Sequence, residues 1–295
     1  MLSGYSSHVS GTPPDLTSRL PQQWVGLLDD AAVFPPGNAP LDEAVTAHRE
    51  RRGEPWADLV GTLVVPDTDL PRLRGAGERL SVVLTGGAGQ VSGPAGLARR
   101  LDLQVAGVEI ALRDLGDLPG NARRVVAAVD DARSRGDLAD DATVHVELPS
   151  TTPSHGWLAA ADEIAGAELH LKFRLGGATA DLTPTAAELA AMVDAALDRE
   201  TPFKCTAGLH RAVAHTDPDG LPRHGFLNLL AATAAAWDGA GSEAVTALLA
   251  STDAAALAAT PAEDLQRARR WFTSFGTCSI DEPRHDLRDL GLLED

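Results

Sequence analysis

Short runs rich in leucine and β-branched residues alternate with helical segments along most of the chain, and this alternation restricts the fold more than any other feature. The strand-like runs read WVGLLDDA, DLVGTLVVP, RLSVVLTGG, VAGVEIAL, ATVHVELP, ELHLKFRLGG, PFKCTAGLH and SFGTCSI. Strands that alternate with helices pair in parallel through right-handed crossovers. Eight such units in 295 residues predict an α/β fold of the (β/α)8, or TIM, barrel type.

An open doubly wound sheet is the structural alternative, but no G-x-G-x-x-G follows the first strand. A long helical block from Gly225 to Trp271 precedes the eighth strand and adds helices that one barrel unit does not need. We expect residues 1–20 to form a loose N-terminal arm and residues 21–295 to form a single barrel domain.

The composition limits the partners of such a domain. Aromatic residues make up only 4% of the chain, so the core must consist mainly of Ala, Leu and Val. The formal charge of −17 argues against nucleic acid and anionic membrane surfaces as partners. The start of the chain lacks a signal-peptide pattern, and no apolar run is long enough to cross a bilayer. We therefore expect a cytoplasmic protein with a small-molecule substrate, for which a homo-oligomeric assembly is compatible with the sequence.

Charged side chains recur on one face of four consecutive predicted strands. Successive strand residues point to opposite faces, so these side chains should face the barrel interior while Leu171, Phe173 and Leu175 pack against helices. Structural ion pairs could explain such charge, but four adjacent strands favour a site at the strand C-termini. His145 and His170 lie nearer the strand starts and favour core positions. The remaining inward set is Glu109, Ala111, Glu147, Lys172, Arg174, Lys204, Thr206, Gly208 and His210.

Lys172 and Lys204 are the only two lysines among 25 basic residues, and both lie in these strands. Arginine would serve as well in an ion pair, but only lysine can lose its proton and form an imine. Imine formation requires a lowered pKa, which a second cation and burial can supply. We therefore expect one lysine to have its pKa lowered by the other and by Arg174, with Glu109 and Glu147 opposing the shift.

The order of these motifs resembles that of class I deoxyribose-phosphate aldolases. GVEIAL, VHVELP, LHLKFRLGG, FKCTAGLHR and SFGTCS correspond to strands four to eight of that family, and LLDDAAVFPP, which contains Asp29, is similar to its first strand. The resemblance implies that Lys172 is the Schiff-base lysine and that Lys204 lowers its pKa. The proton-shuttling aspartate of the family falls on Ala111, so Glu109 would replace it. The segments LDDA.FPP and K.TAGLH…HGFLN also resemble a group of bacterial proteins of unknown activity.

Binding residues are expected around the mouth of the barrel. The same resemblance implies that the Gly-rich turn after Lys204 and the GTCS segment hold an anion or phosphate through backbone N–H groups and hydroxyls. His224 precedes GFLNLLAA and lies one helical turn from Asn228, so the pair would either orient a substrate or cap a helix. The predicted substrate-binding residues are Arg174, Gly176, Gly177, Thr206, Gly208, His210, His224, Asn228, Gly276, Thr277 and Ser279.

A metal site is an open alternative at the same mouth. His210, His215 and His224 surround a Pro/Gly-rich loop and could bind a divalent ion together with nearby carboxylates. The spacing matches no H-E-x-x-H motif, and the cysteines Cys205 and Cys278 have no metal-binding spacing. We therefore assign no metal ligand and no cofactor.

The predicted function is a Schiff-base lyase that acts on a small, anionic or phosphorylated carbonyl compound. Lys172 would form the imine, and Lys204 would lower the pKa of Lys172. Glu147 or Glu109 would transfer protons, with Asp29 as a further acid or base. Two alternatives stay open: a metal-assisted enolising isomerase or hydrolase, and a non-catalytic barrel that binds a small anion.

Overall fold

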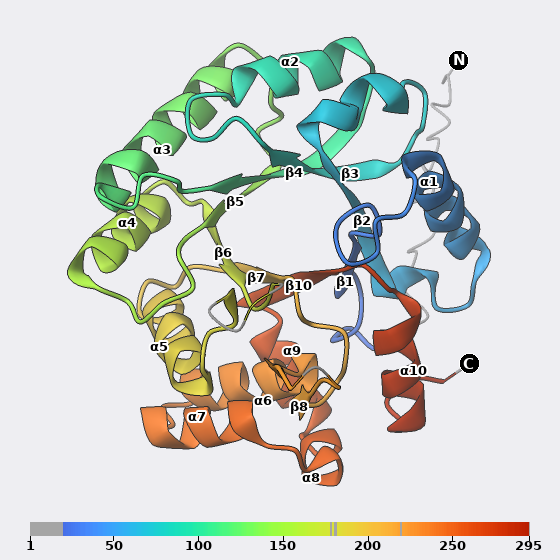
Figure 1. The fold of residues 1–295 in the computed structure, drawn as a ribbon, viewed down its shortest axis with the longest axis vertical. Coiled ribbons are helices and arrows are strands. Elements are labelled where there is room, and N and C mark those ends of the chain that lie inside the picture. The colour runs from blue at the N-terminus through green and yellow to red at the C-terminus, as the bar shows by residue number, and fades with distance from the viewer. Residues whose placement is uncertain (1–19, 178, 180–181, 219, 295) are drawn as a thin grey trace, which may run out of the picture.

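The computed structural model describes residues 20–177, 179, 182–218 and 220–294. Eight parallel strands close into a barrel in the order β1-β10-β7-β6-β5-β4-β3-β2. The strands surround the centre of Figure 1, and the helices lie outside them. The predicted (β/α)8 fold is therefore confirmed. The barrel strands are β1 (Leu28–Asp30), β2 (Val60–Pro66), β3 (Arg79–Leu84), β4 (Gln104–Ala111), β5 (Thr143–Glu147), β6 (His170–Arg174), β7 (Phe203–Thr206) and β10 (Phe272–Thr277).

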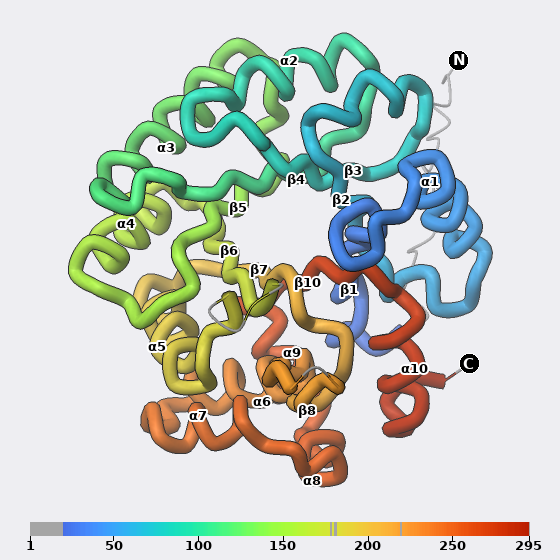
Figure 2. The backbone as a smooth tube through the Cα atoms, in the orientation of Figure 1, coloured from blue at the N-terminus to red at the C-terminus, as the bar shows by residue number. Residues whose placement is uncertain are grey.

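The helices follow the strands along the chain, and the tube in Figure 2 traces this winding around the barrel. A 3-10 helix with Pro71 inside it, η3 (Asp67–Leu73), connects β2 to β3. The other short 3-10 helices are η1 (Arg51–Gly53) and η2 (Ala57–Leu59). The α-helices outside the long block are α1 (Leu41–Glu50), α2 (Ser92–Arg100), α3 (Leu118–Ser134), α4 (His155–Gly166), α5 (Ala186–Leu197) and α10 (Asp281–Asp289).

The expected extra helical block lies between β7 and β10. It consists of α6 (Phe226–Trp237), α7 (Ser242–Ala250), α8 (Ala254–Ala258) and α9 (Ala262–Ala268). Helix α6 is buried on all sides over Phe226–Ala234, because it packs against the barrel strand β10 and also against α7 and α9. A helix that is apolar all round is stable only in such an enclosed position. The outer helices thus provide the cover that α6 needs.

Side-chain caps fix where several helices begin. Thr185 and Glu188 form a reciprocal capping box at the start of α5, and Asp117 and Ser154 accept backbone N–H bonds at the starts of α3 and α4. Each cap satisfies N–H groups that have no partner within the helix. These helix starts lie just after the C-terminal ends of the strands, so the caps also set the loops around the barrel mouth.

The predicted division between the two strand faces is confirmed. Leu171 and Phe173 are fully buried on the outer face, where the Phe173 ring lies 6.3 Å from the ring of Trp157 in α4. The parallel register pairs Lys172 with Glu147 on one side and with Lys204 on the other. Because register partners on neighbouring strands point the same way, these charged side chains meet inside the barrel. Over the described part of the chain, no helix combines the length and apolar character needed to span a membrane.

Candidate active site

Both lysines lie in the barrel interior and share one carboxylate. Nζ of Lys172 lies 2.7 Å from Oε2 of Glu109, and Nζ of Lys204 lies 2.7 Å from Oε1 of the same residue. Lys172 also pairs with Glu147 at 2.9 Å, and Lys204 pairs with Asp29 at 2.7 Å. The side chain of Glu109 therefore bridges the two ammonium groups, and each ammonium has one further carboxylate of its own.

Neighbouring strands hold these carboxylates in position. Ser81 of β3 donates its hydroxyl to Oε1 of Glu109 at 2.7 Å. Asp29 of β1 accepts hydrogen bonds from the hydroxyl of Ser274 at 2.6 Å and from the backbone N–H and hydroxyl of Thr62. Hydrogen bonds donated to a buried carboxylate favour its ionised form. The aspartate that follows, Asp30, points to the other face and pairs there with His48 and Arg51.

The third carboxylate connects the lysines to the barrel mouth. Nε of Arg174 donates to Oε1 of Glu147 at 2.9 Å, while the other oxygen of Glu147 faces Lys172. The Arg174 side chain is 42% exposed, so its other N–H groups can reach solvent or a ligand. The cluster contains three carboxylates and three cations, and its formal charges balance.

The carboxylates of the cluster are held ionised. Burial alone would raise the pKa of Glu109, but the two ammonium groups outweigh burial and hold that pKa well below its usual range. The same balance lowers the pKa of Asp29, through Lys204, and of Glu147, through Lys172 and Arg174. All three groups therefore carry negative charge at neutral pH.

The predicted lowering of a lysine pKa is wrong for this arrangement. Burial favours the neutral amine of Lys172, but Glu109 and Glu147 outweigh it and raise the pKa above its usual value. Asp29 and Glu109 do the same for Lys204. An opposite charge at ~2.7 Å contributes about 6 kcal/mol at an effective dielectric near 20, whereas a like charge at ~6 Å contributes about 2.8 kcal/mol. Direct carboxylate contacts therefore exceed the repulsion between the two lysines.

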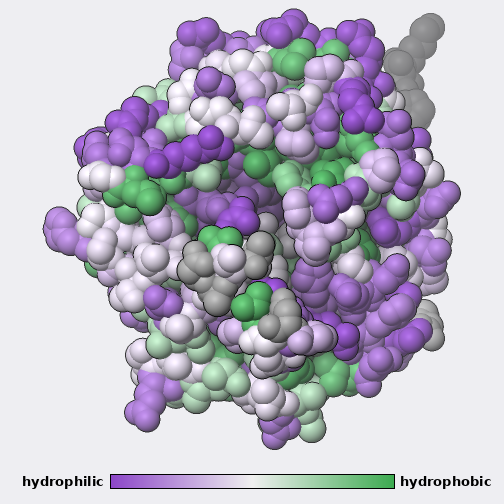
Figure 3. Space-filling view, viewed as in Figure 1, coloured by the Kyte–Doolittle hydropathy of each residue, from purple (hydrophilic) through white to green (hydrophobic). Residues whose placement is uncertain are grey.

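A cavity of about 630 Å³ opens above this cluster at the C-terminal ends of the strands. Glu109, Lys172 and Arg174 are among its lining residues, and Lys204 is not among the described ones. Both lysines are nearly fully buried, with Lys172 4% and Lys204 1% exposed. Phe34, Pro35 and Pro36 of the LLDDAAVFPP segment form part of its wall. Figure 3 shows this face of the molecule hollowed near its centre, with hydrophilic side chains inside the hollow. Lys172 is thus the lysine that reaches the accessible space.

The glycine-rich turns that were predicted to bind an anion lie at this cavity. Gly177, Thr206, Gly208 and Gly276 line it. Gly208 has a φ of +79°, and a Cβ there would lie 2.9 Å from the carbonyl oxygen of Leu175. Gly176 is absent from the described lining, but a Cβ on it would lie 3.0 Å from Cα of Gly208. The β6 and β7 turns can approach each other this closely only because both residues are glycines.

The last part of the predicted binding set lies at the C-terminal end of β10. The hydroxyl of Thr277 donates to the carbonyl of Ser279 at 3.0 Å, and Ser279 lines a second, outer groove. His210 borders both the cavity and the groove, as do Cys278 and Arg223. Neither Cys278 nor Arg223 was predicted as a site residue. Cys278 lies inside the GTCS segment, where its position between two predicted binding residues was the available signal.

The loop histidines do not converge. His210 contacts Cys278 and Glu282, His215 contacts Asp217, and Nε2 of His224 donates to the carbonyl of Pro184 at 2.7 Å. Within the residues that the structure describes, no group of three or more His, Cys, Asp or Glu side chains is arranged to hold a metal ion. The geometry therefore gives the metal-assisted alternative no ligand set in that part of the chain.

His224 and Asn228 form hydrogen bonds with the backbone of the loops next to α6. The side chain of Asn228 is fully buried, accepts the backbone N–H of Ala214 and donates to the carbonyls of Leu248 and Ser251. Neither His224 nor Asn228 is among the described residues that line the cavity. Their predicted contact with a substrate is therefore not carried into the proposal below.

His145 and His170 form an edge-to-face pair below the lysines, with ring centroids 5.3 Å apart. Burial lowers the pKa of both imidazoles, and the charge of Lys204 adds to this effect at His145. Both rings are therefore neutral at neutral pH. His145 is buried, in agreement with the prediction of a core histidine, whereas His170 is only partly buried.

The fold is similar to that of a solved aldolase. The tetrameric deoxyribose phosphate aldolase from Aeropyrum pernix superposes with a TM-score of 0.54 and 12% sequence identity, over 94% of this chain and 100% of that one. This likeness shows the fold and confirms, at that level, the distant resemblance inferred from the motifs. The sequence matches no protein-family model and no curated protein.

Proposed function

We propose that this protein is a Schiff-base lyase that cleaves or forms a carbon–carbon bond in a small, anionic carbonyl compound. The observation that carries the proposal is the position of Lys172. This residue lines a cavity at the C-terminal ends of the barrel strands, and its amine lies between two carboxylates. This end of the barrel is where catalytic groups lie in TIM-barrel enzymes.

Lys172 is a better candidate for the nucleophile than Lys204. Lys204 is enclosed between Asp29 and Glu109 and does not reach the described wall of the cavity. A substrate carbonyl can approach Lys172 from the cavity without disturbing that inner pair. Lys204 then acts as the fixed cation that keeps Glu109 ionised.

Glu147 supplies the proton path that the raised pKa of Lys172 requires. Nζ of Lys172 passes a proton to Oε2 of Glu147, 2.9 Å away, and the neutral amine attacks the carbonyl carbon while the π electron pair moves to the oxygen. One proton of the new nitrogen adduct moves to that oxygen and gives the carbinolamine hydroxyl. Glu147 then returns its proton to this hydroxyl, which leaves as water as the iminium forms. The same carboxylate then takes the proton of the β-hydroxyl while the carbon–carbon bond breaks and its electron pair moves to the iminium.

Arg174 selects the charge of the substrate. Its guanidinium contacts Glu147 through Nε and is half exposed at the cavity, so its remaining N–H groups can bind a carboxylate or phosphate. The backbone of the Gly208 and Gly276 turns lies around the same cavity and offers further donors.

Reductive trapping tests this proposal. The protein is incubated with borohydride and a panel of small carbonyl compounds that carry a carboxylate or phosphate, and the mass of the intact chain is measured. We expect a stable adduct in the wild type and in Lys204→Arg, and none in Lys172→Arg. Thermal unfolding of each variant confirms that it folds. An adduct that persists in Lys172→Arg, or no adduct with any compound, contradicts the proposal.

The raised pKa of Lys172 favours one second candidate, an enolising isomerase without an imine. In that case the Lys172 ammonium stabilises the enolate oxygen and Glu147 removes the α-proton. Solvent deuterium exchange into the substrate without a borohydride adduct would identify this reaction.

Assembly and location remain proposals as well. The tetrameric state of the similar Aeropyrum pernix aldolase supports a homo-oligomer, which light scattering of the purified protein tests. A cytoplasmic location agrees with the acidic composition and is tested by cell fractionation.

A further inference from the structure

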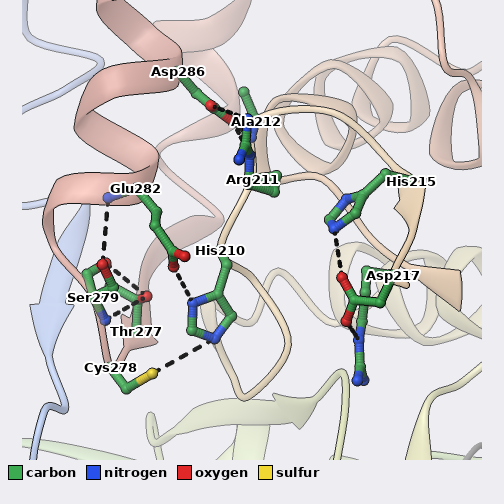
Figure 4. A network of polar contacts seen from close by, with 11 residues as sticks. His210, Arg211, Ala212, His215, Asp217, Thr277, Cys278, Ser279, Glu282 and Asp286 are labelled. Carbon is green, nitrogen blue, oxygen red and sulfur yellow. Dashed lines mark hydrogen bonds and ion pairs between the residues drawn. The ribbon is translucent and has the colours of Figure 1, made fainter. Parts of the chain in front are cut away.

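Cys278, His210 and Glu282 form a second polar cluster (Figure 4), and Cys278 and His210 line the same cavity as Lys172. Cys278 follows β10 directly, His210 lies in the connection from β7 to α6, and Glu282 lies in the first turn of α10. The sulfur of Cys278 lies 3.8 Å from Nε2 of His210, and Oε2 of Glu282 lies 2.8 Å from Nδ1. Figure 4 shows the imidazole between the thiol and the carboxylate.

The three side chains are arranged as a nucleophile, a base and a carboxylate that orients the base. Because a carboxylate only accepts hydrogen bonds, Nδ1 of His210 carries a proton toward Glu282 and Nε2 faces the thiol. This tautomer is the one that can take the thiol proton. The contacts with Cys278 and Glu282 together raise the pKa of His210 against the opposing effect of burial, so they favour the imidazolium that a thiolate needs beside it.

The surroundings of the cluster keep it accessible. Cys278 and His210 line both the lysine cavity and an outer groove of about 950 Å³. Among the neighbouring charges of that groove, Arg211 pairs with Asp286 at 2.8 Å and Arg223 pairs with Asp217 at 2.6 Å. The other cysteine differs: Cys205 is fully buried, and burial raises the pKa of its thiol well above the usual range. The chain therefore contains one accessible thiol with a base and one enclosed thiol without access.

We propose that Cys278 and His210 form a second nucleophilic site, which captures the carbonyl carbon of a small aldehyde as a thiohemiacetal. Nε2 of His210 takes the thiol proton, and the thiolate forms a bond to the carbonyl carbon while the π electron pair moves to the oxygen. The imidazolium then gives its proton to that oxygen. The step is a net addition of the S–H bond across the C=O bond and needs no further reactant.

This inference stands on the thiol cluster and does not depend on an imine at Lys172. Because the two sites border one cavity, an aldehyde that enters for either can meet both. Their products differ in the bond formed, since the lysine site would give an imine carbon and the cysteine site a tetrahedral carbon bonded to sulfur. The two proposals can therefore fail independently.

Alkylation by iodoacetamide at pH 6.5, followed by peptide mass spectrometry, tests the activation of the thiol. A free thiol is mostly protonated at this pH, so we expect Cys278 to react about tenfold faster in the wild type than in His210→Gln. Glu282→Gln should slow the reaction less. Asp281→Asn removes the same charge from the same helix turn and should leave the rate unchanged. Equal rates in the wild type and His210→Gln would overturn the proposal.

Carbon NMR with [1-13C]glycolaldehyde tests the capture itself in the unmodified protein. We expect a protein-bound tetrahedral carbon signal that is lost in Cys278→Ser and kept in Cys205→Ser. A spectrum in which Cys278→Ser keeps the signal, or in which the wild type shows none, would overturn the proposal. Circular dichroism of both serine variants establishes that a lost signal is not the result of unfolding.

Discussion

Replacing Glu109 by glutamine should strongly destabilise the protein. Glu109 is 2% exposed and lies 2.7 Å from each of two buried ammonium groups. Glutamine has almost the same shape, so the packing changes little, but the bridging charge is lost. Lys172 then has only Glu147 and Lys204 only Asp29 as a counter-charge.

The magnitude follows from the cost of an incompletely paired buried charge. Breaking a buried ion pair by removing one partner costs ~3–5 kcal/mol, and the amide N–H₂ group of glutamine would also face an ammonium. Proteins are stable by only ~5–15 kcal/mol, so such a loss is a large share of the total. We expect the free energy of unfolding to fall by about 3–5 kcal/mol in Glu109→Gln.

Urea unfolding followed by tryptophan fluorescence measures this loss, since Trp24, Trp157 and Trp271 are buried. The midpoint should fall while the slope with denaturant stays the same. The control is Glu43→Gln, an exposed carboxylate in the first turn of α1, which should change stability by less than ~0.5 kcal/mol. A loss below ~1 kcal/mol for Glu109→Gln would show that the two lysines are not both charged and paired through this residue.

Three further predictions concern charge and backbone. The pKa values of Asp29, Glu109 and Glu147 are lowered in the folded protein, so their ion pairs stabilise the fold fully at a pH above the ordinary carboxyl pKa of about 4. The free energy of unfolding, measured by urea titration, should therefore fall as the pH drops below about 4. The fall should be less steep in Glu109→Gln, which lacks one of these carboxylates. Arg269 donates hydrogen bonds to the backbone carbonyls of Gln23, Val25, Phe272 and Thr273, and its burial lowers the pKa of its guanidinium to about 10. Arg269→Met removes these hydrogen bonds and should lower the free energy of unfolding by ~2–4 kcal/mol in the same assay. Gly208→Ala would strain a left-handed residue and bring Cβ within 2.9 Å of a carbonyl, so it should destabilise the protein by ~1–3 kcal/mol and weaken anion binding measured by calorimetry.

The sequence predicts the barrel well because its signals are local. Strand and helix periodicities alternate, and the side of a strand on which Lys172 or Phe173 lies follows from parity alone. Parity and chain order also bring Lys172 and Lys204 to neighbouring strands, which the register confirms. The predicted meeting of the lysines inside the barrel therefore needs no long-range information.

The pKa shifts of the site could not be predicted from the sequence in the same way. Whether Lys172 has a raised or lowered pKa depends on distances of 2.7 and 2.9 Å to carboxylates on other strands, which parity cannot supply. The bridging position of Glu109 also arises from closure of the barrel, since β4 and β7 are not sheet neighbours. The thiol cluster is a similar case, because Glu282 reaches His210 across 72 positions of the chain through the location of α10.

We propose that Lys172, and not Lys204, presents its amine to the substrate. Peptide mapping of the wild-type protein after borohydride reduction with a trapped carbonyl compound tests it most directly, because both lysines are present and compete in the same molecule. We expect the added mass on the peptide that contains Lys172. An adduct on the Lys204 peptide instead would contradict it.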